Sequence, residues 1–187
     1  AKDLVAVNEQ WNIAFYADAI HNDPTVVSGW TTSETNYMHF FVPDKETEVG
    51  VSQRHHGIWD NSKATLIAAD ANVFNSAVNY IRVEGFQVHA LNSTTFSRGI
   101  HFSNMSGGVN IIADSNIVKG THQAISTGSH FGIGTTSSGG VTTGFASFTN
   151  NIVYGFNSGG VNNVCFYPTY LGLAHFNIFN IRISFTF

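Results

Sequence analysis

Charged residues are scarce in this chain of 187 residues, where Asp, Glu, Lys and Arg make up only 11%, against about 25% in an average soluble domain. The surface must therefore be wetted mostly by Ser, Thr, Asn and Gly. The formal net charge of −4 gives no reason to expect a nucleic-acid partner, because nucleic-acid-binding domains normally carry a basic patch. The one cysteine, Cys165, excludes an intrachain disulfide and is neutral evidence on the compartment.

Long apolar runs and a leader sequence are also absent. No stretch of 18 or more apolar residues occurs, so we expect no membrane span. The chain does not begin with Met and carries no recognisable signal peptide, which leads us to expect a mature form or a fragment of a longer chain. Its length fits one domain and is sufficient to bury a sizeable core.

Good helix-forming stretches are rare as well. The one plausible helix is "LVAVNEQWNIAFYADAI" (4–20), and its second half also alternates like a strand. The rest consists of short β-type runs separated by turns such as "TTSSGG" (135–140) and "NSGG" (157–160), which mark loops between strands. We therefore predict a nearly all-β fold, with strands within residues 25–30, 36–42, 64–69, 79–88, 98–103, 109–118, 146–156, 159–167 and 176–183.

One short phrase returns at intervals of about thirty residues. "ADSNIVKG" (113–120) shares four identities with "FTNNIVYG" (148–155), and "VEGFQVHA" (83–90) has the same apolar and polar rhythm. A β-sandwich would need hairpin turns, yet two-residue Asn-Gly and Asp-Gly turns are absent, whereas a β-solenoid needs equivalent strands at a near-constant interval. The register puts three sets of side chains inward: Ile81, Val83, Phe86 and Val88; Ile111, Ala113, Asn116 and Val118; Ala146, Phe148, Asn151 and Val153.

Two further expectations follow from this register. Asn116 and Asn151 occupy equivalent inward places, where stacked asparagines can form a hydrogen-bonded ladder, while Phe86 takes that place one coil earlier. A second strand is predicted to recur at Gly99-Ile100, Ala124-Ile125 and Gly160-Val161.

This pattern resembles the right-handed parallel β-helix of the pectin-lyase-like superfamily over roughly residues 11–165. "TVVSGWTTSETNYMHFFVP" (25–43) is similar to the first coils of such proteins, and "NYIRVEGFQV" (79–88) to a core strand. The resemblance implies one β-helix domain over residues 1–187, each coil lying about 4.8 Å from the last. The superfamily includes polysaccharide lyases, glycoside hydrolases, pectin esterases, phage tailspikes and non-catalytic surface proteins, so the fold alone does not choose a function.

The first candidate site is an outward column of equivalent residues, Glu84, Asp114 and Thr149. Two carboxylates one coil apart would lie roughly 5 Å from each other. Such proximity raises one pKa, which suits a general acid, and it is close to the carboxyl separation of a retaining glycosidase. The same pair could help to bind Ca²⁺ through oxygen ligands. The alternative is two solvated residues at a bend.

The second candidate site is the outward column His89, Lys119 and Tyr154. A polysaccharide lyase removes a proton next to a uronate carboxylate and returns one to the leaving oxygen. His or Lys could act as the base and Tyr as the acid, with Lys also neutralising the carboxylate. The alternative is three ordinary surface residues.

The third candidate is the loop "PDKETEVGVSQRHHGIWDNSK" (43–63), which holds seven charged residues. We expect Arg54, His55, His56, Trp59 and Asp60 to bind substrate, because long loops on a regular scaffold often bind ligands and Trp can stack on a sugar ring. Adjacent histidines are not a metal signature, and we predict no protein metal site here. The alternative is a solvated loop that covers one flank.

The last segment, residues 164–187, carries seven aromatic residues and a single charge, Arg182. The end of a solenoid needs a polar cap or a partner, because an open coil exposes a strand edge. This segment looks like neither a cap nor a regular coil. We therefore expect an atypical C-terminus, with truncation or a homo-oligomer contact through its aromatic residues as the alternatives.

Together these features give two functional hypotheses. One is an extracellular or cell-surface carbohydrate-active β-helix that acts on a polysaccharide as a lyase or a glycoside hydrolase. The other is a non-catalytic β-helix of an adhesion, surface or virion-spike type. The resemblance favours the first, whereas the shortage of charge after residue 86 and the aromatic C-terminus favour the second.

Overall fold

The computed structural model describes residues 2–92, 96–122, 128–156, 163–168, 175–179 and 182–184. Over these residues the chain is mostly β-strand, as predicted, and its strands pair in parallel. Neither of the described helices, each four residues long, is long and apolar enough to cross a membrane. The elements are α1 (Leu4–Val7), β1 (Trp11–Ala14), β2 (Thr25–Val27), β3 (Met38–Phe41), α2 (Glu46–Val49), β4 (Thr65–Ala69), β5 (Asn72–Ser76), β6 (Tyr80–Glu84), β7 (Gln87–Asn92), β8 (Ser97–Asp114), β9 (Ile117–His122), β10 (His130–Thr149), β11 (Ile152–Tyr154), β12 (Asn163–Pro168), β13 (His175–Phe179) and β14 (Arg182–Ser184).

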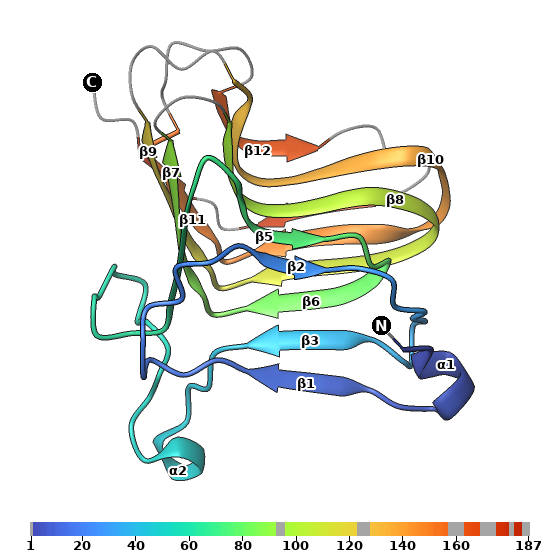
Figure 1. The fold of residues 1–187 in the computed structure, drawn as a ribbon, viewed down its shortest axis with the longest axis horizontal. Coiled ribbons are helices and arrows are strands. Elements are labelled where there is room, and N and C mark those ends of the chain that lie inside the picture. Colours follow the sequence, from blue (N-terminus) through green and yellow to red (C-terminus); the bar gives the residue numbers. More distant parts are fainter. Residues whose placement is uncertain are drawn as a thin grey trace.

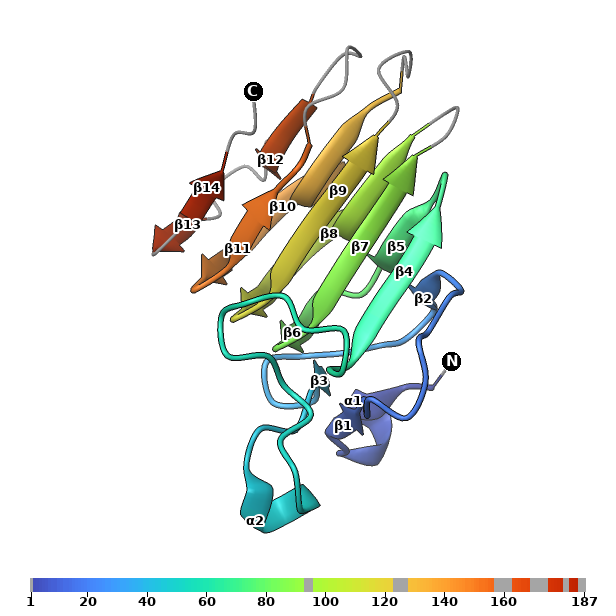
Figure 2. The ribbon, with the colours of Figure 1, turned by 90° about the vertical axis from the view of Figure 1, so that its left-hand side faces the viewer.

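Parallel pairing arranges these strands in three rows (Figure 1). Row 1 holds β1, β3, β6, the second halves of β8 and β10, and β13, whereas row 2 holds β2, β5, the first halves of β8 and β10, and β12. Row 3 holds β14, β11, β9, β7 and β4, which lie side by side in Figure 2. Buried apolar side chains from all three rows form one core cluster, which leaves out Ile117 and Phe131.

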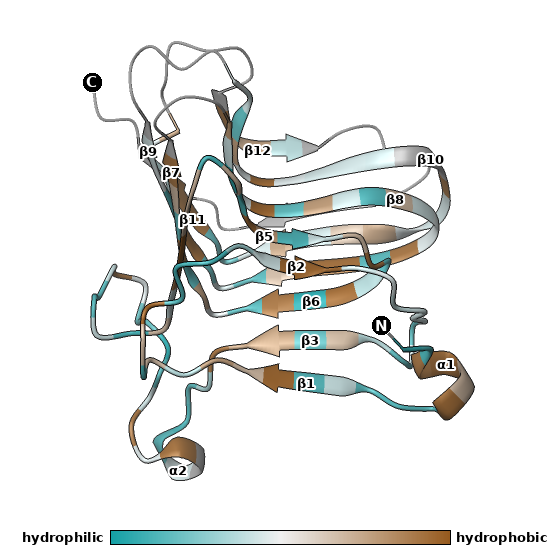
Figure 3. Cartoon of the chain, viewed as in Figure 1, coloured by the Kyte–Doolittle hydropathy of each residue, from teal (hydrophilic) through white to brown (hydrophobic). Residues whose placement is uncertain are grey.

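The register within the rows is the one that the repeated phrase predicts. Paired residues lie 30 and then 35 positions apart: Val83–Ala113–Phe148 in row 1 and Val88–Val118–Val153 in row 3. All twelve side chains expected to point inward are buried. Along β6 buried apolar and partly exposed hydrophilic residues alternate (Figure 3), as a strand with one face on the core requires.

The bend between rows 1 and 3 repeats in three successive passes of the chain. Gly85, Ser115 and Asn150 occupy equivalent places, and their φ angles are 79°, 54° and 55°. This left-handed conformation turns the chain within two residues, and the next side chain points into the core. Phe86, Asn116 and Asn151 are the residues that follow, and each is fully buried.

Asn116 and Asn151 bond to each other as the sequence predicts. Asn116 Nδ2 donates to Asn151 Oδ1 at 3.0 Å and to Val83 O at 3.1 Å, while Asn116 Oδ1 accepts from Phe86 N at 3.0 Å. Asn151 Nδ2 donates in turn to Ala113 O at 2.8 Å. The two carboxamides thus satisfy backbone groups that the bend leaves without a strand partner.

Three local expectations are wrong. The helix expected over residues 4–20 ends at Val7, and the alternating residues that follow form β1. The expected turn "TTSSGG" lies within β10, where shifts of register between Thr135 and Thr143 accompany the bend from row 2 to row 1. The strand equivalent to Gly99-Ile100 contains Ile133, because Ile100 pairs with Ile133; residues 124–125, 157–160 and 161 lie outside the described residues.

The described part of the C-terminal segment continues the rows. β12 and β13 both pair with β10, and β14 pairs with β11, so this part is more regular than its composition suggests. The aromatic side chains beyond Tyr167, on which the expected homo-oligomer contact depends, lie outside the described residues.

Candidate functional site

The charged loop is an expanded corner between rows 1 and 3. Phe41 pairs with Glu84 and Thr65 pairs with Gln87, so residues 42–64 take the place that Gly85 and Phe86 fill in the next pass. We refer to residues 43–63 as the corner loop. The corner loop begins and ends beside the bend between Glu84 and Gln87. Both predicted columns lie next to this bend.

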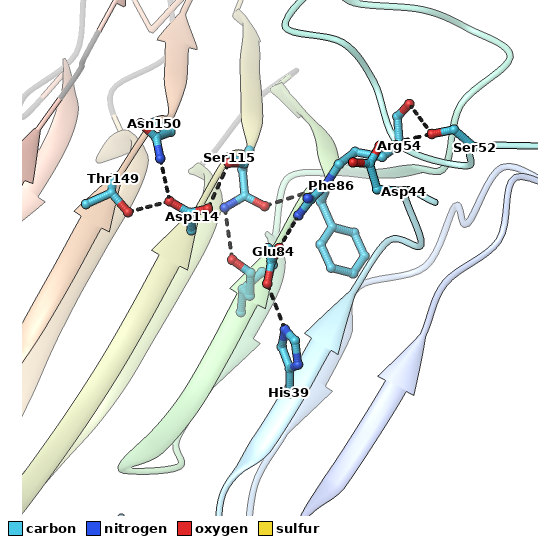
Figure 4. Close-up of polar contacts among 12 residues, drawn as sticks. His39, Asp44, Ser52, Arg54, Glu84, Phe86, Asp114, Ser115, Thr149 and Asn150 are labelled. Atoms are coloured by element: carbon cyan, nitrogen blue, oxygen red, sulfur yellow. Dashed lines mark hydrogen bonds and ion pairs between the residues drawn. The ribbon is translucent and has the colours of Figure 1, made fainter. Parts of the chain in front are cut away.

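Arg54 anchors the corner loop to this bend. Its Nη2 donates to Glu84 Oε1 at 2.6 Å, and its guanidinium lies against Gly85, where an added Cβ would overlap it. Gly85 therefore provides both the left-handed turn and the space for Arg54. Figure 4 shows Arg54 reaching from the loop to the end of β6.

Gln87 holds the other end of the corner loop. Its side chain is fully buried, and its Oε1 accepts from Asp60 N at 2.7 Å while its Nε2 donates to Asp60 O at 2.7 Å. Nε2 also donates to Thr65 Oγ1 at 3.0 Å. One carboxamide thus binds both backbone polar groups of Asp60 and fixes the position of the adjacent Trp59.

His55 is packed between the corner loop and the bend. It is only 8% exposed, and its Nδ1 accepts from Gly57 N at 3.1 Å. Burial, assisted by the charge of Arg54, lowers the pKa of His55 to about 4, although the nearby backbone of Ser115 and Phe86 acts in the opposite direction. His55 is therefore neutral near pH 7.

Glu84 is held as an ionised carboxylate. His39 Nε2 donates to its Oε2 at 3.0 Å, opposite the Arg54 contact on Oε1. The hydrogen bond from His39, followed by the bond and charge of Arg54, lowers the pKa of Glu84 to about 2 against the effect of burial. The raised pKa expected from a neighbouring carboxylate is therefore wrong for Glu84, which has no proton to donate near neutral pH.

Asp114 does lie beside Glu84 in row 1, and Thr149 beside Asp114, as the predicted column requires. Its Oδ1 accepts from Thr149 Oγ1 and from Asn150 Nδ2, the latter at 3.0 Å, and its Oδ2 accepts from Ser115 Oγ at 2.8 Å (Figure 4). The Asp114 carboxylate thus accepts hydrogen bonds from neutral side chains, one from the same pass of the chain and two from the next pass.

The second column is also assembled as predicted, and Trp59 joins it. His89 pairs with Lys119, and Lys119 with Tyr154, in row 3. The Trp59 ring lies 5.8 Å from the His89 ring and 5.5 Å from Lys119 Nζ. We call Trp59, His89 and Lys119 the Trp59 cluster.

The environment of this column sets the protonation of two of its members. Burial, followed by the charge of Lys119, lowers the pKa of His89 to about 4, so its imidazole is neutral near pH 7. Burial raises the pKa of the Tyr154 hydroxyl, which therefore keeps its proton. His89 Nε2 is hydrogen-bonded to Thr121 Oγ1 at 2.9 Å.

Two hollows border the corner loop. His56 lines both of them, and the five loop residues expected to bind substrate all line one or the other. The first, of about 280 Å³, is lined by Asp44, Arg54, His55, His56, Gly57, Ser115, Asn150 and Ile152. The second, of about 520 Å³, is lined by His56, Ile58, Trp59, Asp60 and Asn61.

A metal site does not emerge from these groups. Among the residues that the structure describes, no three His, Cys, Asp or Glu side chains are grouped so that they could hold a metal ion. The oxygens of Glu84 and Asp114, which were candidates for Ca²⁺ binding, accept hydrogen bonds from protein groups.

Two residues of this region were not predicted from the sequence to belong to a site. His39 was read only as part of a strand, yet it sets the pKa of Glu84. Gln87 was read as an ordinary strand residue, yet it fixes the corner loop. Aligning Phe41 with Glu84 and Thr65 with Gln87 would have revealed the loop as an insertion and pointed to both.

No family model, no curated protein and no solved structure matches the chain.

Proposed function

We propose that the chain is a right-handed parallel β-helix of the pectin-lyase-like type that binds a polysaccharide beside the corner loop, in a secreted or cell-surface setting. Support for the β-helix comes from the three rows of parallel strands, the spacing of 30 and then 35 residues along Val83–Ala113–Phe148, and the asparagine pair at the repeated bend. Support for a polysaccharide ligand comes from the corner loop.

The Trp59 cluster is the observation that carries the ligand. An indole ring offers a flat apolar face for a pyranose ring, and Trp59 borders a hollow large enough for a sugar residue. The bond from Trp59 Nε1 to Asn61 Oδ1 at 2.9 Å fixes the ring, and Lys119 supplies a polar group beside it. A polymer lying along the loop would reach both hollows, because His56 lines each of them.

Elimination is the catalytic chemistry that this surface fits better than hydrolysis. Neutral His89 can accept the proton next to a uronate carboxylate, Lys119 can bind that carboxylate, and protonated Tyr154 can donate to the leaving oxygen. Retaining hydrolysis would need a protonated carboxyl group at the first column, where the pKa of Glu84 is lowered to about 2.

A non-catalytic adhesion, surface or virion-spike module is the second candidate. Its support is that Glu84, Asp114 and His89 are each already hydrogen-bonded to protein groups. Such a set of bonds suits a surface that binds without turnover.

A binding screen with one reporter tryptophan tests the proposal. The chain has three tryptophans, so the variant Trp11→Phe/Trp30→Phe leaves Trp59 as the sole indole. Both substitutions fall on one contacting pair, whose ring centroids are 4.7 Å apart. Acidic and neutral polysaccharides are titrated into this protein while Trp59 fluorescence, reducing ends and the absorbance of unsaturated uronates are recorded. We expect a saturable fluorescence change with at least one polymer.

The variants then separate the candidates. Trp59→Ala lacks the reporter, so its binding is measured by calorimetric titration. It should bind about 2 kcal/mol more weakly, or roughly thirtyfold, as at other aromatic contact sites. Unsaturated products that disappear in His89→Ala would support the lyase, whereas binding without products would support the non-catalytic module. Binding that survives Trp59→Ala unchanged, or no binding to any polymer, would overturn the proposed site.

A further inference from the structure

Arg98 stands on an aromatic platform on the outer side of row 2. Its Cζ lies 5.1 Å from the ring centroid of Phe96 and 5.1 Å from that of Phe131. Phe131 is 1% exposed but does not belong to the core cluster. Its ring instead meets the edge of His101 at 5.2 Å and stacks on Tyr167 at 5.3 Å. The platform is therefore built on the surface of the strands, apart from the core.

No acidic side chain neutralises Arg98 within the described part of the chain. It takes part in none of the ion pairs found there, and its Nε is buried without a hydrogen-bond acceptor. Asp70 lies in the same region, since its charge and that of Arg98 both act on His130, but it forms no ion pair with Arg98 in the described part of the chain. Contact with two rings offsets part of the cost of removing the cation from water, and an anion would offset more.

The neighbours of Arg98 include polar atoms that the fold leaves without a hydrogen-bond partner. Asn72 pairs with Arg98 and Asn75 pairs with His101 in the same row. Both asparagine Oδ1 atoms and His101 Nδ1 are buried without a hydrogen-bond partner, while Phe96 is 37% exposed. An unpaired cation thus lies next to unused polar atoms and an accessible aromatic ring.

We propose that Arg98, with Phe96 and Asn72, forms a binding site for an acidic sugar residue. The guanidinium binds the carboxylate or sulfate group of the sugar, Phe96 contacts the apolar face of its ring, and the carboxamide of Asn72 bonds a hydroxyl. This site lies on row 2, whereas the Trp59 cluster lies on row 3, and it does not depend on ligand binding there.

The side-chain Nε–Hε signals of arginine in a ¹⁵N-correlated NMR spectrum test this site. The chain has four arginines, and Arg98→Gln assigns one signal; should that variant not fold, Arg98→Lys removes the same signal. Trigalacturonate and a sulfated galactotriose supply the two kinds of anionic sugar, and neutral galactotriose is the control ligand. Arg82 is the internal control, because its Cζ also lies over a ring, that of Tyr37 at 3.9 Å, but Glu34 lines the same hollow.

We expect the Arg98 signal to shift saturably with at least one acidic trisaccharide, with an affinity about tenfold tighter than any effect on Arg82. A shift with trigalacturonate indicates a carboxylate ligand, and a shift with the sulfated galactotriose indicates a sulfate ligand. The shift should persist in Trp59→Ala, so the outcome does not depend on the Trp59 cluster. Three outcomes would overturn the site. The Arg98 signal would not shift with either acidic ligand, would shift equally with neutral galactotriose, or would shift in parallel with the Arg82 signal.

Discussion

Arg54 and Glu84 face each other across the corner, with 2.6 Å between Nη2 and Oε1. His39 occupies the other carboxylate oxygen at 3.0 Å, so one strand end holds the long loop and a neighbouring strand together. This contact also keeps Glu84 ionised, which determines how stability depends on pH.

Glu84→Gln should lower the free energy of unfolding by about 1–2 kcal/mol at pH 7, a figure reduced for solvent screening because Glu84 is 35% exposed. The pKa of Glu84 falls from 4.5 to about 2 on folding. Its contribution is therefore complete above about pH 4.5 and is lost as the pH falls through about 2. Urea unfolding at pH 7 and at pH 2 measures both values. Glu34→Gln is the matched control, and equal acid sensitivity in wild type and Glu84→Gln would contradict the assignment.

Gly85→Asn should release the corner loop with less backbone strain than other substitutions of this glycine. Asn tolerates the left-handed φ better than other residues with a side chain, and Asn150 already has it at the equivalent place. The new Cβ would overlap Arg54, so we expect faster proteolysis within residues 43–63 and a loss of about 1–3 kcal/mol. Arg54→Ala should make the same Gly85 substitution nearly neutral, and additive effects in that double variant would argue against the contact.

Asn116→Ala should cost about 2–4 kcal/mol, because it leaves Phe86 N–H and Asn151 Oδ1 buried with fewer partners. Asn151→Ala should cost a similar amount, since its Nδ2 serves Ala113 O. Chemical denaturation of both single variants and the double variant measures their coupling. We expect the double variant to lose less than the sum; strict additivity would show that the carboxamides act independently.

Gln87→Leu should weaken both stability and polysaccharide binding without touching the ligand surface. It removes both side-chain bonds to the backbone of Asp60, whose C=O keeps only the bond from Lys63 N at 3.0 Å. We expect a cost of about 1–2 kcal/mol and a less firmly held Trp59. Gln53→Leu is the control, because Gln53 bonds Ala17 N and Val51 O instead. Calorimetric titration should show weaker binding for Gln87→Leu only, and normal binding by both variants would exclude a positioning role for Gln87.

The stacking of the rows was predictable because it depends on short-range patterns. Each of the three passes repeats inward apolar residues at alternate positions, and two of them share the asparagine at the bend. Ala113 could therefore be aligned with both Val83 and Phe148 from sequence. Both outward columns followed from the same alignment.

The chemistry of the site was less predictable because it depends on contacts that the repeat does not contain. The pKa of Glu84 is governed by His39 and Arg54, which belong to a neighbouring strand and to an insertion. The course of β10 was hidden for another reason, since "TTSSGG" has the composition of a turn but lies where a strand bends.

The expanded corner has a consequence for how this protein could acquire new ligands. The strands on either side keep their register with Glu84 and Gln87 whether the connection holds two residues or runs from 42 to 64. Under the proposed function, ligand recognition lies in a replaceable loop and the architecture in the framework that carries it. Exchange of that loop would then change the ligand while leaving the framework as it is.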